Sequence, residues 1–448
     1  MSDRQFDLIV IGAGMAGLAA TRKAASDGKR VAIVDTRPYG GTCALRGCDP
    51  KKVLVGVAGA VDEARRLTGY GVTGETGIDW PALMAFKRTF TEPVPRKLEK
   101  GLERQGVATL HGPSRFTSDA TIAIGGDEFG AERFLIATGA RPRELGIPGE
   151  ELVATSTDFL DLDALPERIA LIGGGYVSFE FAHIAARAGA KVTILHRSER
   201  PLKGFDPDLV SELVRASEEL GIEVRTQAEA TCVGRDGEAR TVHVRGSEAV
   251  VVDLVVHGAG RVPDLDALDL SSADVEFDEL RGVRVNEYLQ SVSNPRVYAA
   301  GDAADTAGWP LTPVAVHEGL IATSNLLRGN RKTSNYTGTP SVVFTIPALA
   351  RAGMTESEAQ EQGLDFEVES NDTSGWFTAR RSRAQHAASK VLVEKGTGRI
   401  LGAHLLGMDA GETIDIFALA IRHGLTAGSL RTSVLLHPAA ASDVVHMV

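Results

Sequence analysis

The sequence predicts two doubly wound α/β domains followed by a smaller α+β domain. Residues 6–35 resemble residues 168–196, and each stretch has the pattern of an apolar strand, a glycine turn, a helix of small residues and a second apolar strand. This is one βαβ unit present twice, which is typical of parallel sheets covered by helices. From about residue 335, short β-rich runs such as SVVFT alternate with helical runs such as TIDIFALAIRHG. That change of pattern predicts a separate α+β domain.

Composition and charge limit the partners and the compartment. The chain has 448 residues, of which 43% are hydrophobic and 24% charged, a balance that is ordinary for a globular protein of several domains. Its net charge of −11 argues against nucleic acid or an anionic membrane as the main partner. The N-terminal residues lead into a strand pattern rather than a signal peptide, and no apolar run reaches the roughly 18 residues of a membrane span. We therefore expect a cytoplasmic protein.

Further elements are predicted around the two repeats. Apolar runs that lead into glycine or proline turns predict strands at 132–142 and 253–264, and PRVYAAGDAAD predicts a strand that ends in a glycine turn and an acid. The run LTPVAVHEGLIATSNLLRG predicts a helix over 311–329, which its final glycine ends.

The first glycine turn has the pattern of a dinucleotide-binding site. Gly12, Gly14 and Gly17 form G-x-G-x-x-G directly after a strand and at the start of a helix. The first glycine allows the tight turn, the second lets a pyrophosphate approach the backbone, and the third lets helix and strand pack closely. The helix N-terminus favours the phosphates, and Asp35 at the end of the second strand can take the ribose hydroxyls. The alternative is a glycine-rich turn that serves packing alone.

The second repeat carries a similar turn with a basic ending. Its glycines are Gly173 and Gly175, and Ser178 at the third position still permits close packing. The second strand ends in HRSERPLK instead of an acid. Arg197 and a second cation nearby would bind a 2′-phosphate that a carboxylate would repel. This pattern favours NADP(H) over NAD(H), and the alternative is a solvated basic turn.

Two dinucleotide sites suggest two cofactors that pass electrons between them. The first site is the flavin candidate, because YAAGDAAD supplies a further acid, Asp302, at a strand end. Two of the three cysteines, Cys43 and Cys48, lie in GGTCALRGCDPKK, residues 40–52. Taken alone, this pair can be a metal clip, a redox pair or incidental.

The chain resembles the FAD-dependent pyridine nucleotide–disulfide oxidoreductases, which include glutathione reductase, dihydrolipoamide dehydrogenase and mercuric reductase. The resemblance spans essentially the whole chain. Its carriers, in order, are GAGMAG, GGTCALRGCDPKK, ATGARP, GGGYVSFEFA, GAGRVPD, YAAGDAAD, LTPVAVHEG and LLHP. Within the family, RGCDPKK and HRSERPLKGFD are most similar to glutathione reductases. The resemblance implies FAD at the first site, NADPH at the second, and a redox-active disulfide between Cys43 and Cys48.

The resemblance also implies roles for single residues. Cys48 would be the thiolate against the flavin, and Cys43 the outer thiol that attacks the substrate, with a lowered pKa because the thiolate is the nucleophile. Lys51 would lie near the flavin N5 and pair with Glu180, since a cation there stabilises the anion of a reduced flavin. Tyr176 would cover the nicotinamide side of the flavin. The other implied cofactor contacts are Gly41, Thr42, Thr138, Gly139 and Thr312 for FAD, and Arg197 and Lys203 for the 2′-phosphate.

The geometry of a disulfide in this stretch requires a distorted turn. In an ideal helix five residues advance about 7.5 Å, whereas the Cα atoms of a disulfide lie roughly 4.4–6.8 Å apart. Gly40, Gly41 and Gly47 permit such a distortion. A metal site is the competing interpretation, but the sequence has no second cysteine pair. The third cysteine, Cys232, fits a buried small apolar residue better than a catalyst.

The C-terminus departs from the family pattern. The family ends in His-Pro with a glutamate five residues after the histidine, and that histidine acts on the partner subunit's site as acid and base for the outer thiol. Here the histidine is His437, the matching position is Ser442, and the nearest acid is Asp443. The hypothesis is that Asp443 orients His437 imperfectly, so that thiol exchange is slower or tuned to another substrate.

The substrate positions depart as well. Arg22 matches an arginine with which glutathione reductases bind the carboxylates of glutathione. Three other family positions are occupied by Met15, Leu98 and Leu320, in place of a serine, an aromatic gate and an arginine. These losses make the expected mouth of the site more apolar and less cationic, which puts glutathione disulfide itself in doubt.

The predicted protein is an NADPH-dependent FAD disulfide reductase that works as a homodimer with a shared active site. The expected domains are an FAD-binding domain at 1–147 and 262–334, an NAD(P)H-binding domain at 148–261 and a dimerisation domain at 335–448. One alternative is an NAD enzyme similar to dihydrolipoamide dehydrogenase. Others are an NADPH-dependent reductase of quinones or other non-thiol acceptors, and a redox-sensing binding module. A mercuric reductase is not expected, because the chain ends in SDVVHMV without a cysteine pair.

Overall fold

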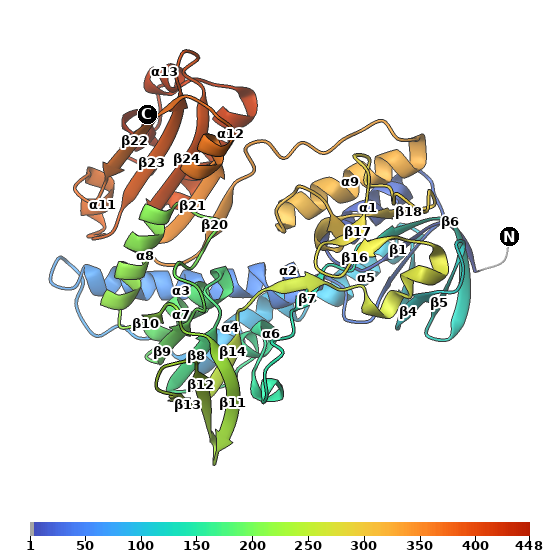
Figure 1. The fold of residues 1–448 in the computed structure, drawn as a ribbon, viewed down its shortest axis with the longest axis horizontal. Helices are drawn as coiled ribbons and strands as arrows, with labels where there is room; N and C mark the ends of the chain where they lie inside the picture. The colour runs from blue at the N-terminus through green and yellow to red at the C-terminus, as the bar shows by residue number, and fades with distance from the viewer. Residues whose placement is uncertain (1–3) are drawn as a thin grey trace. The chain divides into compact units, whose positions relative to one another are not determined.

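The computed structural model describes residues 4–448, so residues 1–3, with which the predicted FAD-binding domain begins, lie outside the described residues (Figure 1). The chain forms two compact units. The first comprises the residues up to Lys51 with Phe86–Arg143 and Arg261–Tyr336, and the second comprises Lys52–Ala85, Glu144–Gly260 and Thr337–Val448. None of the helices in residues 4–448 is long and apolar enough to cross a membrane.

The first unit is built on a largely parallel sheet with the strand order β3-β2-β1-β6-β5-β4, and β18 pairs in parallel with β6 on the edge opposite β1. Its strands are β1 (Gln5–Ile11), β2 (Val31–Asp35), β3 (Ala108–His111), β4 (Ser114–Phe116), β5 (Thr121–Ile124), β6 (Asp127–Ile136) and β18 (Val297–Ala299). Smaller pairings involve β7 (Ala140–Pro142) with β15 (Arg261–Pro263), and β16 (Phe277–Asp278) with β17 (Gly282–Arg284) and β19 (Ala304–Asp305).

Two helices of the first unit pack together beside this sheet (Figure 1). They are α1 (Met15–Ser26) and α9 (Thr312–Arg328), and Gly329 ends α9 as the sequence predicts. The close approach depends on Gly319, where a Cβ would collide with the backbone of Ala16. The other elements are α2 (Gly41–Arg46), the first turn of α3 (Cys48–Arg66), part of α4 (Trp80–Thr91), α5 (Val94–Glu103), and the 3-10 turns η2 (Asp266–Leu268), η3 (Leu270–Ala273) and η4 (Gly301–Ala303).

The second unit contains a second parallel sheet of order β10-β9-β8-β14 and an antiparallel sheet of order β11-β12-β13. Its strands are β8 (Arg168–Ile172), β9 (Lys191–Leu195), β10 (Glu223–Arg225), β11 (Ala230–Asp236), β12 (Ala239–Val244), β13 (Val250–Val252) and β14 (Leu254–His257). The helical elements of this part are η1 (Glu150–Leu152), α6 (Ser156–Leu160), α7 (Tyr176–Arg187) and α8 (Pro207–Glu219). The repeat in the sequence therefore corresponds to one βαβ unit in each parallel sheet.

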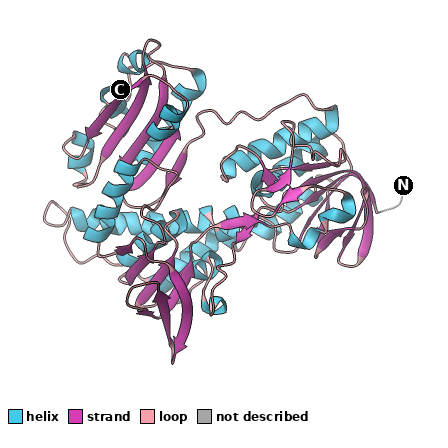
Figure 2. Cartoon of the chain, viewed as in Figure 1, coloured by secondary structure: helices cyan, strands magenta, loops and turns pink. Residues whose placement is uncertain are grey.

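The rest of the second unit is a five-stranded antiparallel sheet with helices (Figure 2). Its strands follow the order β20-β21-β24-β23-β22, with the bounds Ser341–Val343, Ala348–Gly353, Ile400–Gly407, Ala388–Glu394 and Phe366–Asp372. Its helices are α10 (Glu356–Glu361), α11 (Phe377–Arg381), α12 (Ala410–His423), α13 (Ala427–Arg431), α14 (Ala440–Asp443) and η5 (Val444–His446), and α12 packs on β21 and β24. This confirms the predicted α/β and α+β fold classes.

One hydrophobic core joins the second parallel sheet to the five-stranded sheet. Phe179 and Leu213, from α7 and α8, belong to the same buried cluster as Val343, Leu349 and Leu406 of the five-stranded sheet. The segments predicted as the NAD(P)H-binding and dimerisation domains thus share a core and one compact unit. The predicted domain boundaries stay a prediction.

Candidate functional site

The first glycine turn forms a tight cradle at the end of β1. Gly12 has φ +106° and donates to the carbonyl of Val34 at 2.8 Å. A Cβ on Gly12 would collide with the backbone of Ala137. Gly14 lies against Gly41, since a Cβ on Gly41 would approach the Cα of Gly14 to 2.6 Å. Backbone is thus packed on backbone, which is the tight turn that the predicted pyrophosphate site at the N-terminus of α1 requires.

Asp35 lies at the end of β2, as predicted. Its Oδ2 accepts from the backbone N–H of Ala13 at 2.8 Å and its Oδ1 from that of Arg37 at 2.8 Å. These bonds fix the carboxylate beside the glycine turn, and each oxygen keeps a second lone pair for a ribose hydroxyl.

The region also holds buried polar groups that suit a flavin. The Thr138 hydroxyl is buried and has no hydrogen-bond partner within residues 4–448. The next residue, Gly139, has φ +72° and accepts from the backbone N–H of Asp264 at 3.0 Å. Asp302 lies in η4, directly after β18, and burial raises the pKa of its carboxyl group. An orphaned hydroxyl, a buried acid and the glycine cradle together fit FAD.

Glu318 is a residue of this region that the sequence analysis missed. It is 1% exposed on α9 and accepts from the backbone N–H of Gly301 at 2.7 Å, from Thr306 at 2.8 Å and from Tyr336 at 2.6 Å. Burial raises the pKa of its carboxyl group. Glu318 therefore fixes the turn that carries Asp302. The sequence pattern that could have identified it is an acid within the apolar run VAVHEGLIA. A charged residue in a helix that is buried on most sides needs partners, which indicates a specific role.

The two cysteines lie on either side of a break between helices. Cys43 is in α2, Cys48 begins α3, and Gly47 between them has φ −149° and ψ −108°. The predicted distortion of the turn is thus present. The structure holds both as free thiols, hydrogen bonded to each other, and the sulfur of Cys48 lies 3.4 Å from the hydroxyl of Thr312 at the start of α9. The hydrogen bond brings the two sulfurs together, as the predicted redox pair requires.

The acidity of the pair is opposite to the prediction for Cys43. The hydrogen bond from the Cys43 thiol is the main cause that lowers the pKa of Cys48 to about 6. The hydrogen bond with Thr312 and the charge of Lys51 also lower it, whereas burial raises it. The same hydrogen bond, with burial, raises the pKa of Cys43. The expectation of a lowered pKa for Cys43 is therefore wrong for the dithiol state. The two thiols titrate as a pair, and the direction of the shifts favours the thiolate on Cys48.

The alkylation of Cys48 should follow this acidity. In the reduced protein we expect its rate with iodoacetamide to fall as the pH drops through about 6, because the thiolate is present above that pKa and lost below it. A Thr312→Val variant loses one hydrogen bond to the sulfur and should shift the midpoint upward. The rate is measured at Cys48 by mass spectrometry of the digested protein. A midpoint that stays in the ordinary thiol range in the unmodified protein would contradict the assignment.

The second glycine turn repeats the geometry of the first. Gly173 has φ +112° and donates to the carbonyl of Leu195 at 2.8 Å. Ser178 is fully buried, and a Cβ on Gly258 would collide with its hydroxyl oxygen. The serine thus permits close packing, as expected. Tyr176, the first residue of α7 after Gly175, is 47% exposed, as a residue that can move over a neighbouring ring must be.

Arg197 and Lys203 are both exposed after β9. Burial is the main cause that lowers the pKa of His196, and the charges of Lys203 and Arg197 lower it further. The hydrogen bond between the ring and the carbonyl of Arg200 opposes this shift. Both charges therefore act on the His196 ring, and the predicted phosphate site at Arg197 and Lys203 stays a prediction.

Three further predicted residues lie on α7, on α2 and in β11. Glu180 is 1% exposed on α7, and its Oε1 accepts from the backbone N–H of Phe344 at 2.8 Å. Its pairing with Lys51 stays a prediction. Thr42 is exposed beside Cys43, and Cys232 is a half-buried free thiol in β11.

The C-terminal residues separate the predicted histidine from its acid. His437 is exposed, next to Leu436 at 76% exposure. Asp443 lines a cavity of about 60 Å³ with Thr378, Ser382 and Met408. Among residues 4–448 no hydrogen bond or ion pair joins Asp443 to His437. The orienting role of Asp443 stays a prediction that has no contact in a single chain.

The residues at the predicted substrate positions differ in their exposure to solvent. Arg22 is exposed on α1, and Leu320 is 41% exposed on α9. Leu98 instead packs against the core of the first unit, so it is not an exposed gate residue. Met15 is half-buried at the start of α1. The apolar change at the surface therefore rests on Leu320.

Comparison with known proteins shows that the chain matches one protein family over most of its length. The family model "Pyridine nucleotide-disulphide oxidoreductase" matches residues 6–319, and the model of the dimerisation domain of the same family matches residues 339–448. The chain is 33% identical to a glutathione reductase of Burkholderia cepacia over 99% of both chains. It is 32% identical to a mercuric reductase of Bacillus cereus over 96% of this chain and 69% of that protein.

Solved structures agree. The structure titled "Cu(II) complex of HOCl-induced flavoprotein disulfide reductase RclA from Escherichia coli" matches with a TM-score of 0.89 and 28% identity over 100% of this chain and 99% of that chain. The two copies of the glycine turn, the cysteine pair and the five-stranded sheet thus all fall within matched regions.

Proposed function

The chain belongs to the pyridine nucleotide–disulfide oxidoreductase family, and on that premise we propose that it passes electrons from NADPH through FAD and the Cys43–Cys48 pair to a small disulfide. It is a flavoprotein disulfide reductase of the glutathione reductase, mercuric reductase and RclA type, and the family is FAD-dependent and uses pyridine nucleotides. The observation that carries the proposal is the hydrogen-bonded thiol pair beside Thr312, at the N-terminus of α9.

The preference for NADPH rests on charge. The charges of Arg197 and Lys203 both act on His196, the position at which an enzyme that uses NAD would place an acid. A 2′-phosphate carries negative charge and several acceptor oxygens, so two converging cations stabilise it. The same cations have no partner on NADH, and we therefore infer that NADPH is the better donor.

The thiol chemistry follows from the acidity of the pair. FAD, when bound, supplies the two-electron step that opens the Cys43–Cys48 disulfide. Cys43 then loses its proton to a base and attacks one sulfur of the substrate, which forms a mixed disulfide and releases one thiol. The Cys48 thiolate attacks the sulfur of Cys43, which re-forms the disulfide and releases the second thiol. The sum is one disulfide reduced to two thiols for each dithiol oxidised.

The raised pKa of Cys43 means that a base must remove its proton before it can attack the substrate. A thiol that donates its proton to a neighbouring sulfur is a poor nucleophile until that proton is taken. We propose that His437 of a second subunit takes it and returns it to the leaving thiol. The family dimerisation domain at 339–448 and the exposure of His437 support a homodimer with a shared site.

A two-tag experiment tests the shared site. A purified heterodimer with Cys43→Ser in one subunit and His437→Ala in the other contains one site with both groups intact. We expect about half of the unmodified activity, while each mutant homodimer is nearly inactive. An inactive heterodimer would place the two groups in the same subunit.

The direct test of the function is anaerobic NADPH consumption by the FAD-loaded protein with glutathione disulfide, with NADH and lipoamide as controls. Turnover with NADPH and glutathione disulfide would mean that Arg22 suffices for recognition despite Leu320. Flavin reduction without turnover would leave the relay intact and would move the search to other disulfides. Absence of flavin reduction by either nucleotide would refute the proposal. We also keep the cytoplasm as the proposed compartment, since a thiol pair that cycles needs reducing surroundings.

A metal ion is a second proposed acceptor. The matched RclA structure is described as a Cu(II) complex, and the site of this chain has two thiols with an apolar residue, Leu320, in place of an expected cation. NADPH consumption with Cu(II) and no disulfide would support this acceptor.

A further inference from the structure

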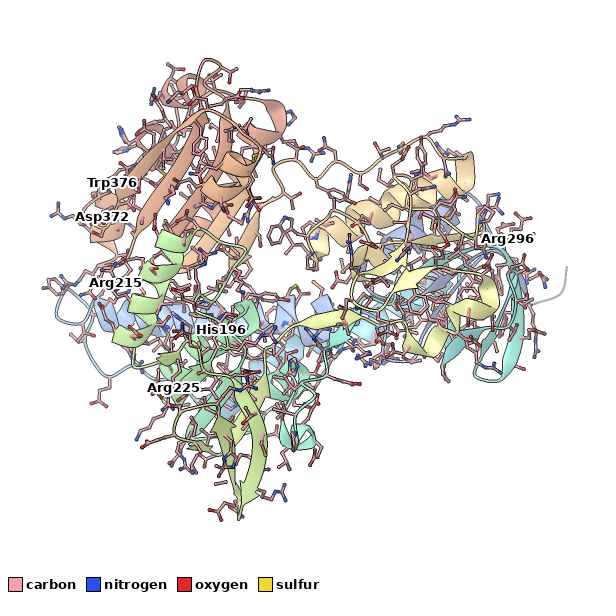
Figure 3. The ribbon with its side chains drawn as sticks, in the orientation of Figure 1. His196, Arg215, Arg225, Arg296, Asp372 and Trp376 are labelled. Carbon is pink, nitrogen blue, oxygen red and sulfur yellow. The ribbon has the colours of Figure 1, made fainter. Side chains whose placement is uncertain are left out.

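The loop after β9, residues 196–206, is held at its start by the second glycine turn. This basic loop carries Arg197 and Lys203. His196, labelled in Figure 3, lies so close to Gly174 that a Cβ there would approach its ring to 2.6 Å. The backbone N–H of Leu202 donates to the carbonyl of Gly174 at 2.9 Å. His196 and Leu202, the residue before Lys203, are thus held against the glycine turn of their own nucleotide-binding fold.

The end of the basic loop is held by cations from the five-stranded sheet. Arg351 on β21 is 5% exposed and donates to the carbonyl of Gly204, to that of Gly353 at 2.6 Å and to Glu358 at 2.9 Å. Because Gly204 follows Lys203 directly, this bond fixes the backbone next to the predicted phosphate ligand.

Lys390 on β23 holds the last residue of the loop. Its ammonium group lies 3.0 Å from Asp206, 2.5 Å from Asp208 and 3.3 Å from Glu356. Lys390 is 3% exposed and Asp206 fully buried. Asp206 also caps α8, since its Oδ1 accepts from the backbone N–H of Asp208 at 3.0 Å and of Leu209 at 3.2 Å. One buried ion pair therefore fixes both the end of the basic loop and the start of α8.

The charge states of this cluster are settled by its surroundings. Burial lowers the pKa of His404, whose ring lies in the same cluster, to about 4, so that this histidine is neutral at working pH. Although burial opposes it, the hydrogen bonds that the ammonium group of Lys390 donates to Asp208 and Asp206 raise the pKa of Lys390, which therefore stays charged. The buried Asp206 carboxylate thus depends on Lys390 for its countercharge.

A buried ion pair is an inefficient way to gain stability. Removing two charges from water costs several kcal/mol for each ion, and apolar residues of similar volume often serve as well or better. In some proteins such a pair instead specifies one arrangement of the groups that it joins. The residues whose geometry depends on it here are those of the basic loop.

We propose that Lys390 and Arg351 are positioning residues that set the selectivity for a 2′-phosphorylated nucleotide. They lie on the sheet of the predicted dimerisation domain, and they act by fixing Gly204 and Asp206, which follow Lys203 in the chain. The inference rests on the proposed NADPH-dependent function and adds two residues that make no contact with the nucleotide.

The test removes the ion pair without leaving a buried charge. In the double variant Lys390→Met, Asp206→Asn, the asparagine can still cap α8. Asp208, whose side chain is 74% exposed, and Glu356, at 38%, can be hydrated. The FAD-loaded protein is reduced with NADPH and with NADH in a stopped-flow instrument, which gives an apparent Kd and a limiting rate for each. We expect the apparent Kd for NADPH to rise about tenfold, as for the loss of one charge-assisted hydrogen bond, with an unchanged limiting rate and little change for NADH.

The matched control is His386→Gln. His386 also links α8 to a distant part of the chain, through Glu212 at 2.6 Å and Glu219 at 2.8 Å, but it contacts the helix beyond its first turn. We expect the ratio of the two Kd values to be unchanged in this variant. The inhibition constant of 2′,5′-ADP, which carries the 2′-phosphate without the nicotinamide, should rise in the double variant in step with the Kd of NADPH.

The outcomes separate the inference from the function on which it rests. Equal losses for NADPH and NADH, or an unchanged ratio, would overturn the positioning role. An unmodified protein that does not prefer NADPH would instead refute the proposed donor. Should the double variant fail to fold, Arg351→Lys keeps the charge but loses the fork between Gly204, Gly353 and Glu358, and it should shift the ratio in the same direction.

Discussion

Replacing Cys43 by serine is expected to abolish the turnover of disulfide substrates, by at least about 10³-fold, while the flavin is still reduced by NADPH. The reason is that the hydroxyl has no sulfur with which to form a mixed disulfide, whereas the nucleotide site and the flavin cradle do not involve this side chain. Cys48 should keep a hydrogen bond, since serine also donates. Steady-state NADPH consumption gives the first quantity, and anaerobic bleaching of the flavin absorbance gives the second.

The control for this variant is Cys232→Ser. Cys232 is a half-buried free thiol in β11, so its replacement tests whether the loss of any thiol is harmful. We expect both activities to be retained in this control. Loss of flavin reduction in Cys43→Ser would show that the roles of the two thiols are wrongly assigned. Retained turnover with Cu(II) or a quinone, but not with a disulfide, would show that Cys43 serves thiol substrates alone.

The second large effect is expected for the double variant Arg197→Ala, Lys203→Ala. Each cation would give the 2′-phosphate a charge-assisted hydrogen bond, and the loss of both should lower kcat/KM for NADPH by about 10²-fold. The efficiency with NADH should change little, because that nucleotide has no group at this position. The measurement is the ratio of kcat/KM for the two nucleotides.

Arg215→Ala is the matched control for charge removal. Arg215, on α8 and labelled in Figure 3, is paired with Glu212 and has 66% of its side chain exposed. The substitution removes one positive charge without touching the basic loop, and we expect the ratio to be unchanged. A double variant that keeps the preference for NADPH would refute the phosphate site and support a solvated basic turn.

The sequence was sufficient for features that depend on local pattern. Gly12 and Gly173 predict the two turns, because both positions need φ values that other residues avoid. The strands before them are buried and apolar. The break between Cys43 and Cys48 was predictable from Gly47, since a regular helix would keep the thiols too far apart.

Features that depend on long-range contacts were not predictable in the same way. The acidity of the cysteine pair depends on which sulfur accepts the hydrogen bond and on Thr312, which is far along the chain. The role of Glu318 requires the turn at Gly301 to be placed against α9. Asp443 is near His437 in the sequence, yet it faces a cavity lined by Thr378 and Met408.

The core shared by α7, α8 and the five-stranded sheet limits how this protein can be divided. A chain cut near residue 335 would keep Phe179 and Leu213 but would lose Val343, Leu349 and Leu406, against which they are buried. The exposed apolar surface would favour aggregation. Transplanting the nucleotide-binding segment alone into another enzyme would therefore fail, and a working exchange of donor specificity must carry the five-stranded sheet with it. In this protein the smallest segment that keeps its core is therefore larger than the nucleotide-binding motif.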